Sequence, residues 1–310
     1  MEKNKIKIAV PASVSNVGPG FDIMGFAIDV ISDVITLTRN NHEEIVIKKI
    51  TGDNGKLTYD PNKNTCTVGM IHLLKYLKLN IGFDVIIEKK IGIGSGLGSS
   101  AASAVGGVFA LNELLDKPFK KKELLNFAME GEKIASKATH ADNVAPCLFG
   151  GFILIRDYNP IDIVNLPFPK NLYCTIIHPQ IEIETAASRK LLGKKVDFKK
   201  AITQWGNVGG LIAGLTTNNY NLIGRSIKDV IVEPIRGKFI PFYEDIKKVA
   251  YKSGVLGCNI SGSGPAIFTL SDNKKIAIIA ARKMQEVCTQ NKIVSKIYIS
   301  KIDKQGPKVL

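Results

Sequence analysis

A glycine-rich segment that leads directly into an alanine-rich stretch limits the folds open to this chain more than any other segment. Residues 91–102 read IGIGSGLGSSAA, with four glycines at alternate positions. Glycines at this density allow positive φ and expose successive backbone N–H groups, and a helix N-terminus adds about half a positive charge. The segment therefore predicts an anion-binding loop for a polyphosphate, followed by a helix that begins at Ser99 or Ser100.

This loop differs from the phosphate loops of two large nucleotide-binding classes. No Lys followed by Ser or Thr closes it, as in a Walker A loop. The DFG and HRD motifs of protein kinases are absent from the sequence. A flexible turn with a serine N-cap is the alternative interpretation, and the GLGSSAA continuation favours the anion loop.

Two further segments are candidates for contact with a small ligand. Residues 11–25 read PASVSNVGPGFDIMG, and their prolines and glycines predict an irregular loop or an Ω-loop after the first strand. Ser13, Asn16 and Asp22 in this loop offer hydrogen bonds to a small polar molecule. Residues 254–266, GVLGCNISGSGPA, predict a second glycine loop whose backbone folds over a bound substrate.

Glu132 is a candidate metal ligand. It follows Gly131, which permits close helix packing, and it is suited to complete a Mg²⁺ shell with a serine of residues 91–102. A surface glutamate is the alternative. His140 is interpreted as a structural hydrogen-bonding residue rather than a base.

The chain is long enough for two domains. Its 310 residues are about twice the roughly 150 residues of a usual domain, and strands and helices intermix without a regular βαβ rhythm. This predicts a two-domain α+β fold. The proline-rich segment 159–169 predicts a loop and the domain junction, which gives domains 1–165 and 166–310. The spacing of apolar residues predicts strands at 5–10, 34–38, 44–50, 83–88, 152–157, 172–178, 265–271 and 294–301. It predicts helices at 65–79, from 99 onward, and at 121–137, 185–192, 199–217, 240–253 and 274–290.

The net charge of +14 raises the question of a nucleic-acid partner. The lysines are spread over the whole length without interleaved aromatic residues, which is typical of a solvated surface. No apolar run reaches the roughly 20 residues that a membrane span needs, and the first residues lack the apolar block of a secretion signal. The five cysteines lie far apart, and the four histidines lack the spacing of a helical metal site. We therefore expect a cytoplasmic protein that binds neither nucleic acid nor membranes.

Taken together, these segments resemble the GHMP kinases, a family of small-molecule kinases. Residues 91–102 are similar to the phosphate loop of that family, and residues 254–266 are similar to its C-terminal glycine motif. Three segments are similar to the branch of the family that phosphorylates homoserine, namely PASVSNVGPGFDIMGFAI at 11–28, ADNVAP at 141–146 and TAASRKLL at 185–192.

Two positions depart from the pattern of that family. Gly92 stands where the phosphate loop usually has proline, which loosens the start of the loop without removing its N–H groups. The segment Glu233-Pro-Ile-Arg236 lacks the aromatic residue that commonly precedes the arginine in the homoserine branch. The second departure concerns the shape of one wall of the substrate pocket.

The resemblance implies an N-terminal domain like the second domain of ribosomal protein S5, a ferredoxin-like C-terminal domain, and ATP bound between them. It implies that Ser100 and Glu132 hold Mg²⁺ and that the adenine lies near residues 62–65. The residues that it assigns to ATP binding are Asn62, Asn64, Thr65, Ile91, Gly92, Ile93, Gly94, Ser95, Gly96, Leu97, Gly98, Ser99, Ser100, Ala101 and Ala102.

The resemblance also implies L-homoserine as the acceptor, converted to O-phospho-L-homoserine in threonine biosynthesis, and it suggests a homodimer. The residues that it assigns to the acceptor are Asn16, Asp22, Asn143, Thr185, Arg189, Arg236 and Gly262. The chemistry of an amino acid agrees with this assignment, because an α-carboxylate suits a bidentate guanidinium. Only six of the 42 basic residues are arginine, and two of the six are in this set. Asp22 and Asn16 offer oxygens to the ammonium group.

Asn143 lies where the mevalonate kinase branch is expected to carry a catalytic aspartate. An amide cannot act as a general base, and phosphoryl transfer depends mainly on positioning and charge neutralisation. We therefore expect in-line attack of the homoserine hydroxyl on the γ-phosphate, with Asn143 orienting the hydroxyl and Asp142 as a rival base. The alternatives are another GHMP kinase such as a mevalonate kinase, a nucleic-acid-binding protein, and a catalytically silent metabolite sensor.

Overall fold

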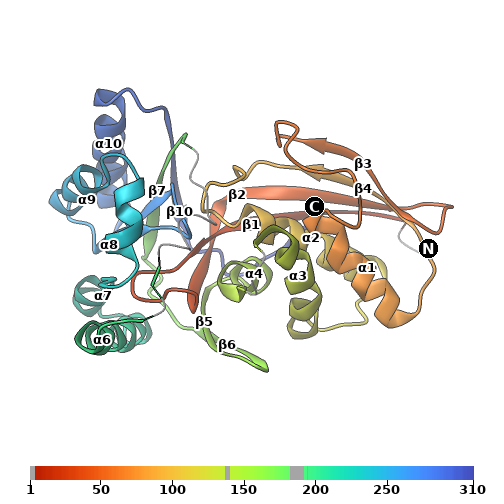
Figure 1. Cartoon of the computed structure of the whole chain (residues 1–310), viewed down its shortest axis with the longest axis horizontal. Coiled ribbons are helices and arrows are strands. Elements are labelled where there is room, and N and C mark those ends of the chain that lie inside the picture. Colours follow the sequence, from red (N-terminus) through yellow and green to blue (C-terminus); the bar gives the residue numbers. More distant parts are fainter. Residues whose placement is uncertain (1–3, 137–139, 182–191, 194) are drawn as a thin grey trace.

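The computed structural model describes residues 4–136, 140–181, 192–193 and 195–310, and it has two domains side by side (Figure 1). The N-terminal domain lies on the right of Figure 1, and the C-terminal domain lies on the left. Each is a sheet covered by helices, so the predicted two-domain α+β fold is confirmed. The expected helix at 185–192, with Thr185 and Arg189, lies outside the described residues.

The N-terminal domain is built on a seven-stranded sheet whose main path runs β11-β1-β2-β4-β3. Along the first strand Ile6, Ile8 and Val10 alternate with more exposed residues, as the two-residue period of a strand requires. A hairpin of β5 and β6 joins this sheet through pairing of β5 with β2. The strands are β1 (Lys5–Ser15), β2 (Met24–Arg39), β3 (Ile45–Thr51), β4 (Phe83–Glu88), β5 (Phe152–Tyr158), β6 (Ile161–Leu166) and β11 (Lys308–Val309).

Four helices pack over this sheet, namely α1 (Thr65–Leu77), α2 (Ser99–Leu114), α3 (Lys121–Ser136) and α4 (Ala141–Phe149) (Figure 1). The α2 helix lies in the middle and is buried over most of its length. Its small residues make this possible, because a Cβ at Gly106 would lie 2.5 Å from Ile35 Cγ1. A Cβ at Gly107 would lie 1.9 Å from the Cys66 carbonyl oxygen. The alanine-rich composition thus lets the helix that follows the anion loop sit directly on the strands.

The C-terminal domain has a four-stranded antiparallel sheet in the order β10-β7-β9-β8, with α9 and α10 over one face. Its opposite face packs on the N-terminal domain, where the rings of Phe268 and Phe26 lie 5.8 Å apart. The strands are β7 (Tyr173–Pro179), β8 (Gly257–Ile260), β9 (Ile267–Ser271) and β10 (Ser295–Lys301). The helices are α6 (Phe198–Thr216), α7 (Tyr220–Ser226), α8 (Glu233–Arg236), α9 (Tyr243–Lys252) and α10 (Lys274–Gln290).

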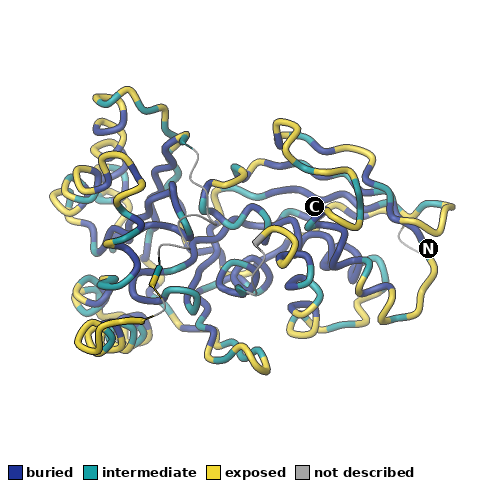
Figure 2. The backbone as a smooth tube through the Cα atoms, in the orientation of Figure 1, coloured by how far each residue is buried: buried dark blue, intermediate teal, exposed yellow. Residues whose placement is uncertain are grey.

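One hydrophobic cluster spans the two domains, and a second cluster lies within the C-terminal domain. Figure 2 shows buried backbone running without a break from one domain to the other, and a single cluster includes Ile8, Phe26 and Phe268. The end of the chain also returns to the N-terminal sheet, where β11 pairs with β1 and Ile302 bridges Ile28. The division into domains 1–165 and 166–310 therefore stays a prediction from the sequence. Among the described residues, no helix combines the length and the apolar character that crossing a bilayer requires.

Three segments differ from the sequence prediction. Residues 11–15 continue β1 beyond a register shift, where Pro11 pairs with Ser32 and Ala12 pairs with Ile28, so the extra residues of this irregularity lie on β2. The expected loop at 11–25 is therefore confined to residues 16–23. Residues 161–166 form β6 inside the expected proline-rich loop, and residues 141–149 form α4 although Pro146 lies within it. Pro146 is the sixth of the nine residues of α4, so it donates no N–H to the Asp142 carbonyl oxygen one turn earlier.

Candidate active site

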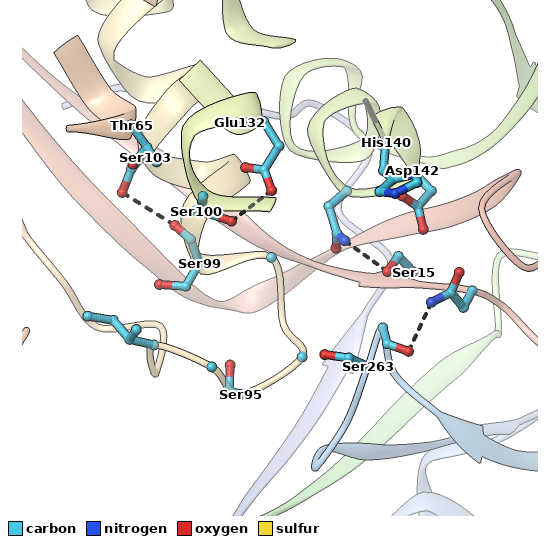
Figure 3. A pocket seen from close by; sticks show the side chains of 18 of the residues that line it. Ser15, Thr65, Ser95, Ser99, Ser100, Ser103, Glu132, His140, Asp142 and Ser263 are labelled. Carbon is cyan, nitrogen blue, oxygen red and sulfur yellow. Dashed lines mark hydrogen bonds between the residues drawn. The ribbon is translucent and has the colours of Figure 1, made fainter. Parts of the chain in front are cut away.

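A cavity of about 320 Å³ opens between the two domains. Figure 3 shows side chains from both domains pointing into it. The residues that line it are Ser15, Asn16, Asp22, Leu57, Thr65, Lys89, Ile93, Gly94, Ser95, Gly96, Gly98, Ser99, Ser100, Ser103, Glu132, Ala135, His140, Asp142, Asn143, Arg236, Gly262 and Ser263. Most of the residues that the sequence analysis assigns to a site thus meet at one place.

The glycine loop forms one wall of this cavity and ends at the start of α2. Gly94, Gly96 and Gly98 have φ of 71°, 82° and 69°, a region that favours glycine. A Cβ at Gly98 would lie 2.1 Å from Ser13 Oγ, and one at Gly96 would lie 2.4 Å from the Ser261 carbonyl oxygen. Both glycines are therefore required by the backbone conformation and by the close neighbours. The free N–H groups of the first turn of α2 face the same space.

The second glycine loop holds the first one in place across the domain boundary. Ser261 Oγ donates to the Gly96 carbonyl oxygen at 2.6 Å, and the Ala266 N–H donates to the Ser95 carbonyl oxygen at 3.1 Å. The Gly262 N–H donates to the Ser15 carbonyl oxygen at 3.1 Å. The C-terminal glycine motif thus acts here as a brace for the loop and as part of the cavity wall.

A buried ion pair fixes both ends of the glycine loop. Lys89 Nζ contacts Asp33 Oδ2 and also donates to the Ser99 carbonyl oxygen and to Ser103 Oγ, both at 2.8 Å. Asp33 Oδ1 accepts from the backbone N–H groups of Lys90 at 2.7 Å and Ile91 at 2.9 Å. The pair therefore connects residues before the loop with the first turn of α2. A charged pair this deeply buried is stable only with such additional hydrogen bonds.

Ser100 and Glu132 lie together at the same end of the cavity. Ser100 Oγ donates to Glu132 Oε1 at 3.0 Å, as Figure 3 shows. Burial raises the pKa of the Glu132 carboxyl from its ordinary value of 4.5 to about 7, opposed by the hydrogen bond from Ser100 and reinforced by the charge of Asp142. A hydroxyl and a carboxylate in contact are oxygen donors of the kind that Mg²⁺ takes from a protein beside phosphate oxygens. The donor set thus fits the metal that the sequence analysis expects.

Asn143 is held by two serines at the end of β1. Its Oδ1 accepts from Ser13 Oγ at 2.8 Å, and its Nδ2 donates to Ser15 Oγ at 2.9 Å. Asp142 is buried beside it at the N-terminus of α4 and lines the cavity. Both residues thus face the space between the metal pair and the second glycine loop.

The opposite wall consists of the loop at 16–23 and of residues from the C-terminal domain. The Asp22 N–H donates to Asn16 Oδ1 at 2.8 Å, and Asn16 Nδ2 donates to the Gly262 carbonyl oxygen at 2.9 Å. Arg236 Nη1 donates to the same carbonyl oxygen at 2.8 Å, and its guanidinium lies 5.1 Å from the centre of the Phe21 ring. Phe21 thus supplies an aromatic contact to Arg236, although the residue directly before Arg236 is Ile235.

His140 also reaches this wall. Its Nδ1 lies 3.6 Å from Asp22 Oδ1, within ion-pair distance when the ring is protonated. Thr185 and Arg189, which complete the expected acceptor set, lie outside the described residues. The described part of this wall therefore offers one carboxylate, Asp22, and one guanidinium, Arg236, to an acceptor.

The expected adenine contacts divide into two groups. Thr65 lines the cavity together with Leu57, Ile93 and Ala135. Asn64 instead caps α1, since its Oδ1 accepts from the Cys66 N–H at 3.0 Å and its Nδ2 donates to the Thr58 carbonyl oxygen at 2.8 Å. Six other expected ATP residues do not line the cavity, namely Asn62, Ile91, Gly92, Leu97, Ala101 and Ala102.

Comparison with known proteins agrees with this geometry. The family models described as GHMP kinases N terminal domain and GHMP kinases C terminal match residues 65–151 and 211–290. The homoserine kinase of Chlorobium phaeobacteroides (strain BS1) is 45% identical over 311 residues, covering 96% of this chain and 97% of its own. The chain belongs to the GHMP kinase family.

Solved structures of other GHMP kinases extend this result. The crystal structure of homoserine kinase from Cytophaga hutchinsonii matches with a TM-score of 0.98 and 48% identity, covering 100% of this chain and 98% of that one. The structure of L. major mevalonate kinase in complex with R-mevalonate matches with a TM-score of 0.74 at 18% identity, covering 97% and 98%. The second match is evidence for the fold alone. The two-domain GHMP kinase fold that the resemblance implies is thus confirmed.

Sequence reasoning missed three residues that hold or contact the glycine loop of this GHMP kinase. Lys89 and Asp33 hold the glycine loop, and His178 packs against Gly92, where a Cβ would lie 3.2 Å from His178 Cε1. Burial, with a smaller contribution from Lys296, lowers the pKa of His178 to about 4, so the ring is neutral beside the loop. Two consecutive lysines, Lys89 and Lys90, precede the glycine loop, and the sequence does not indicate which of the two is buried.

Proposed function

We propose that this protein is a homoserine kinase, which transfers the γ-phosphoryl group of ATP to the hydroxyl of L-homoserine. The observation that carries the proposal is the 45% identity to a curated homoserine kinase over 96% of the chain. The position of Asp22 and Arg236 on one cavity wall supports it, because an amino acid brings an ammonium and a carboxylate to be bound. In metabolism this reaction serves threonine biosynthesis.

At the phosphate end, the N–H groups of the glycine loop and of the first turn of α2 bind the triphosphate of ATP. Ser100 and Glu132 would hold Mg²⁺, which would neutralise charge on the transferred phosphoryl group. The Lys89–Asp33 pair keeps the loop closed around the phosphates. Thr65, Leu57 and Ile93 lie along the cavity and are positioned to contact the adenosine.

At the acceptor end, Arg236 binds the carboxylate of homoserine together with Arg189, and Asp22 binds the ammonium group. These contacts turn the side-chain hydroxyl toward the γ-phosphate. The Asn143 amide, already oriented by Ser13 and Ser15, holds that hydroxyl in line for attack. Phosphoryl transfer through a loose transition state requires positioning more than a base, so Asp142 is not needed to remove the proton.

The test is ADP release by the purified protein with MgATP and one acceptor at a time. The acceptors are homoserine, mevalonate, galactose, shikimate and serine at matched concentrations. We expect turnover with homoserine alone. Turnover with another alcohol would keep the phosphate site and overturn the acceptor assignment, and ATP binding without any turnover would favour a silent sensor.

The assembly and the location of the protein stay predictions. Sedimentation equilibrium of the purified chain tests the expected homodimer, and a monomer at micromolar concentration would contradict it. Fractionation of cells that express the tagged full-length chain tests the expected cytoplasmic location. Recovery of the chain with the membrane fraction would contradict that second prediction.

A further inference from the structure

Gln204 is a buried residue of α6 whose side chain joins two segments outside its own helix through three hydrogen bonds. Its Nε2 donates to the Pro19 carbonyl oxygen at 3.0 Å and to Asp229 Oδ1 at 2.9 Å. Its Oε1 accepts from the Val230 N–H at 3.0 Å. Both N–H groups and the oxygen of this buried amide thus form hydrogen bonds, and the partners lie next to the cavity wall that carries Asp22 and Arg236.

The first partner, Pro19, belongs to the loop that carries Asp22. This loop is short and closed internally, with the Gly20 N–H bonded to the Val17 carbonyl oxygen at 3.0 Å. It also packs against the segment after α7, because a Cβ at Gly18 would lie 2.8 Å from Ile227 Cγ1. The hydrogen bond from Gln204 to the Pro19 carbonyl oxygen therefore helps to fix the position of Asp22 at the cavity wall.

The second partner, Asp229, organises the start of α8. Its Oδ1 accepts from the N–H groups of Ile231 at 2.9 Å and Val232 at 3.0 Å, and its Oδ2 accepts from the Glu233 N–H at 2.8 Å. The single turn of α8 is held by hydrogen bonds of its own, such as the one from the Arg236 N–H to the Val232 carbonyl oxygen at 3.0 Å, and the contacts with Asp229 help to fix its direction. Arg236 is the last residue of α8.

We propose that Gln204 is a positioning residue that sets the spacing between Asp22 and Arg236. The two charged groups of an amino-acid acceptor are a fixed distance apart, so this spacing determines how well both are bound at once. Gln204 therefore acts on acceptor specificity, whereas the phosphate end, which it does not contact, is unaffected. This inference rests on the proposed function, because it takes Arg236 as the carboxylate-binding residue.

The test replaces Gln204 with methionine, which has a similar volume and none of the three hydrogen bonds. The control is Asn207→Leu, because Asn207 lies on the same helix and its Nδ2 bonds only the Lys228 carbonyl oxygen, at 2.9 Å, among the contacts described. Both variants and the wild type are assayed with homoserine and with 3-amino-1-propanol, which is homoserine without its carboxylate.

For Gln204→Met we expect KM for homoserine to rise about tenfold, which corresponds to the net contribution of one hydrogen bond. KM for ATP should stay within about twofold of the wild-type value. The ratio of kcat/KM for homoserine to kcat/KM for 3-amino-1-propanol should fall by a similar factor. Asn207→Leu should leave both values near the wild type. An equal rise in the KM of ATP, or an unchanged ratio between the two acceptors, would overturn the inference.

The same experiment separates this inference from the proposed function. Wild-type protein that does not use homoserine contradicts the function, and the KM comparison is then made with the alcohol that it does use. If circular dichroism shows that Gln204→Met is unfolded, Asp229→Asn replaces it, since that change keeps one oxygen and weakens the cap of α8. Asp229→Asn is also expected to raise KM for the acceptor alone, and an equal change in both KM values would contradict the proposal.

Discussion

The end of the cavity proposed for phosphate takes its loop and Ser100 from one continuous stretch of chain, whereas the end proposed for the acceptor joins segments that are far apart in sequence. Residues 91–102 supply the loop, the start of α2 and Ser100 in one motif. At the acceptor end, Asn16 and Gly262 are bonded although they lie 246 positions apart. A local motif of this kind depends on a single segment of the chain. An assembled wall can change its acceptor by changing any of several segments.

The largest expected effect tests whether the phosphate end depends on its buried ion pair. Lys89→Met leaves Asp33 charged and buried, which should lower the free energy of unfolding by about 3–5 kcal/mol. Urea denaturation measures this loss. The control is Lys7→Met, because Lys7 and Glu88 form an exposed pair 3.1 Å apart. That pair should contribute at most about 1 kcal/mol. Equal losses in the two variants would show that burial does not distinguish them.

The second prediction concerns the pH dependence of the ligand-free protein. The folded state raises the pKa of Glu132 from 4.5 to about 7, so the folded protein holds a proton that the unfolded chain releases. Stability from this group is complete below pH 4.5 and is lost as pH rises through about 7. The difference amounts to roughly 3 kcal/mol. Urea denaturation between pH 5 and pH 8 should show less of this decline in Glu132→Gln. A decline of the same size in both proteins would contradict the prediction.

Sequence reasoning predicted the phosphate end in more detail than the acceptor end. The start of α2 at Ser99 follows from the glycine and serine pattern, and the apolar spacing predicted α10 with its bounds and α1 with a small error at its C-terminal end. Hydrogen bonds such as the one from Gln204 to Pro19 join residues 185 positions apart and leave no local pattern. Lys89, in a chain with many solvated lysines, has no feature of composition that predicts burial.

The third prediction tests whether Glu132, beside Ser100, holds Mg²⁺ at the end of the cavity proposed for phosphate. Glu132→Gln keeps the volume of the side chain and removes the charge that would hold Mg²⁺. We expect kcat/KM to fall about 100-fold, and raising the Mg²⁺ concentration should restore part of it. The control is Glu130→Gln, on the same helix, because Glu130 is partly exposed and pairs with Lys133. A loss in both variants, or none in either, would show that Glu132 does not hold the metal.

The smallest expected effect lies where the two ends meet, at Asn143 and Asp142. If Asn143 orients the hydroxyl by a hydrogen bond, Asn143→Ala should lower kcat about tenfold at unchanged KM for ATP. Asp142→Asn should then lower kcat by less than that, because no base is required in a loose transition state. Single-turnover measurements with homoserine separate the chemical step from product release. If Asp142→Asn loses far more kcat than Asn143→Ala at equal ATP affinity, Asp142 is the base and the in-line mechanism without a base is wrong. The junction between the two ends would then carry a proton transfer as well as the positioning of the acceptor.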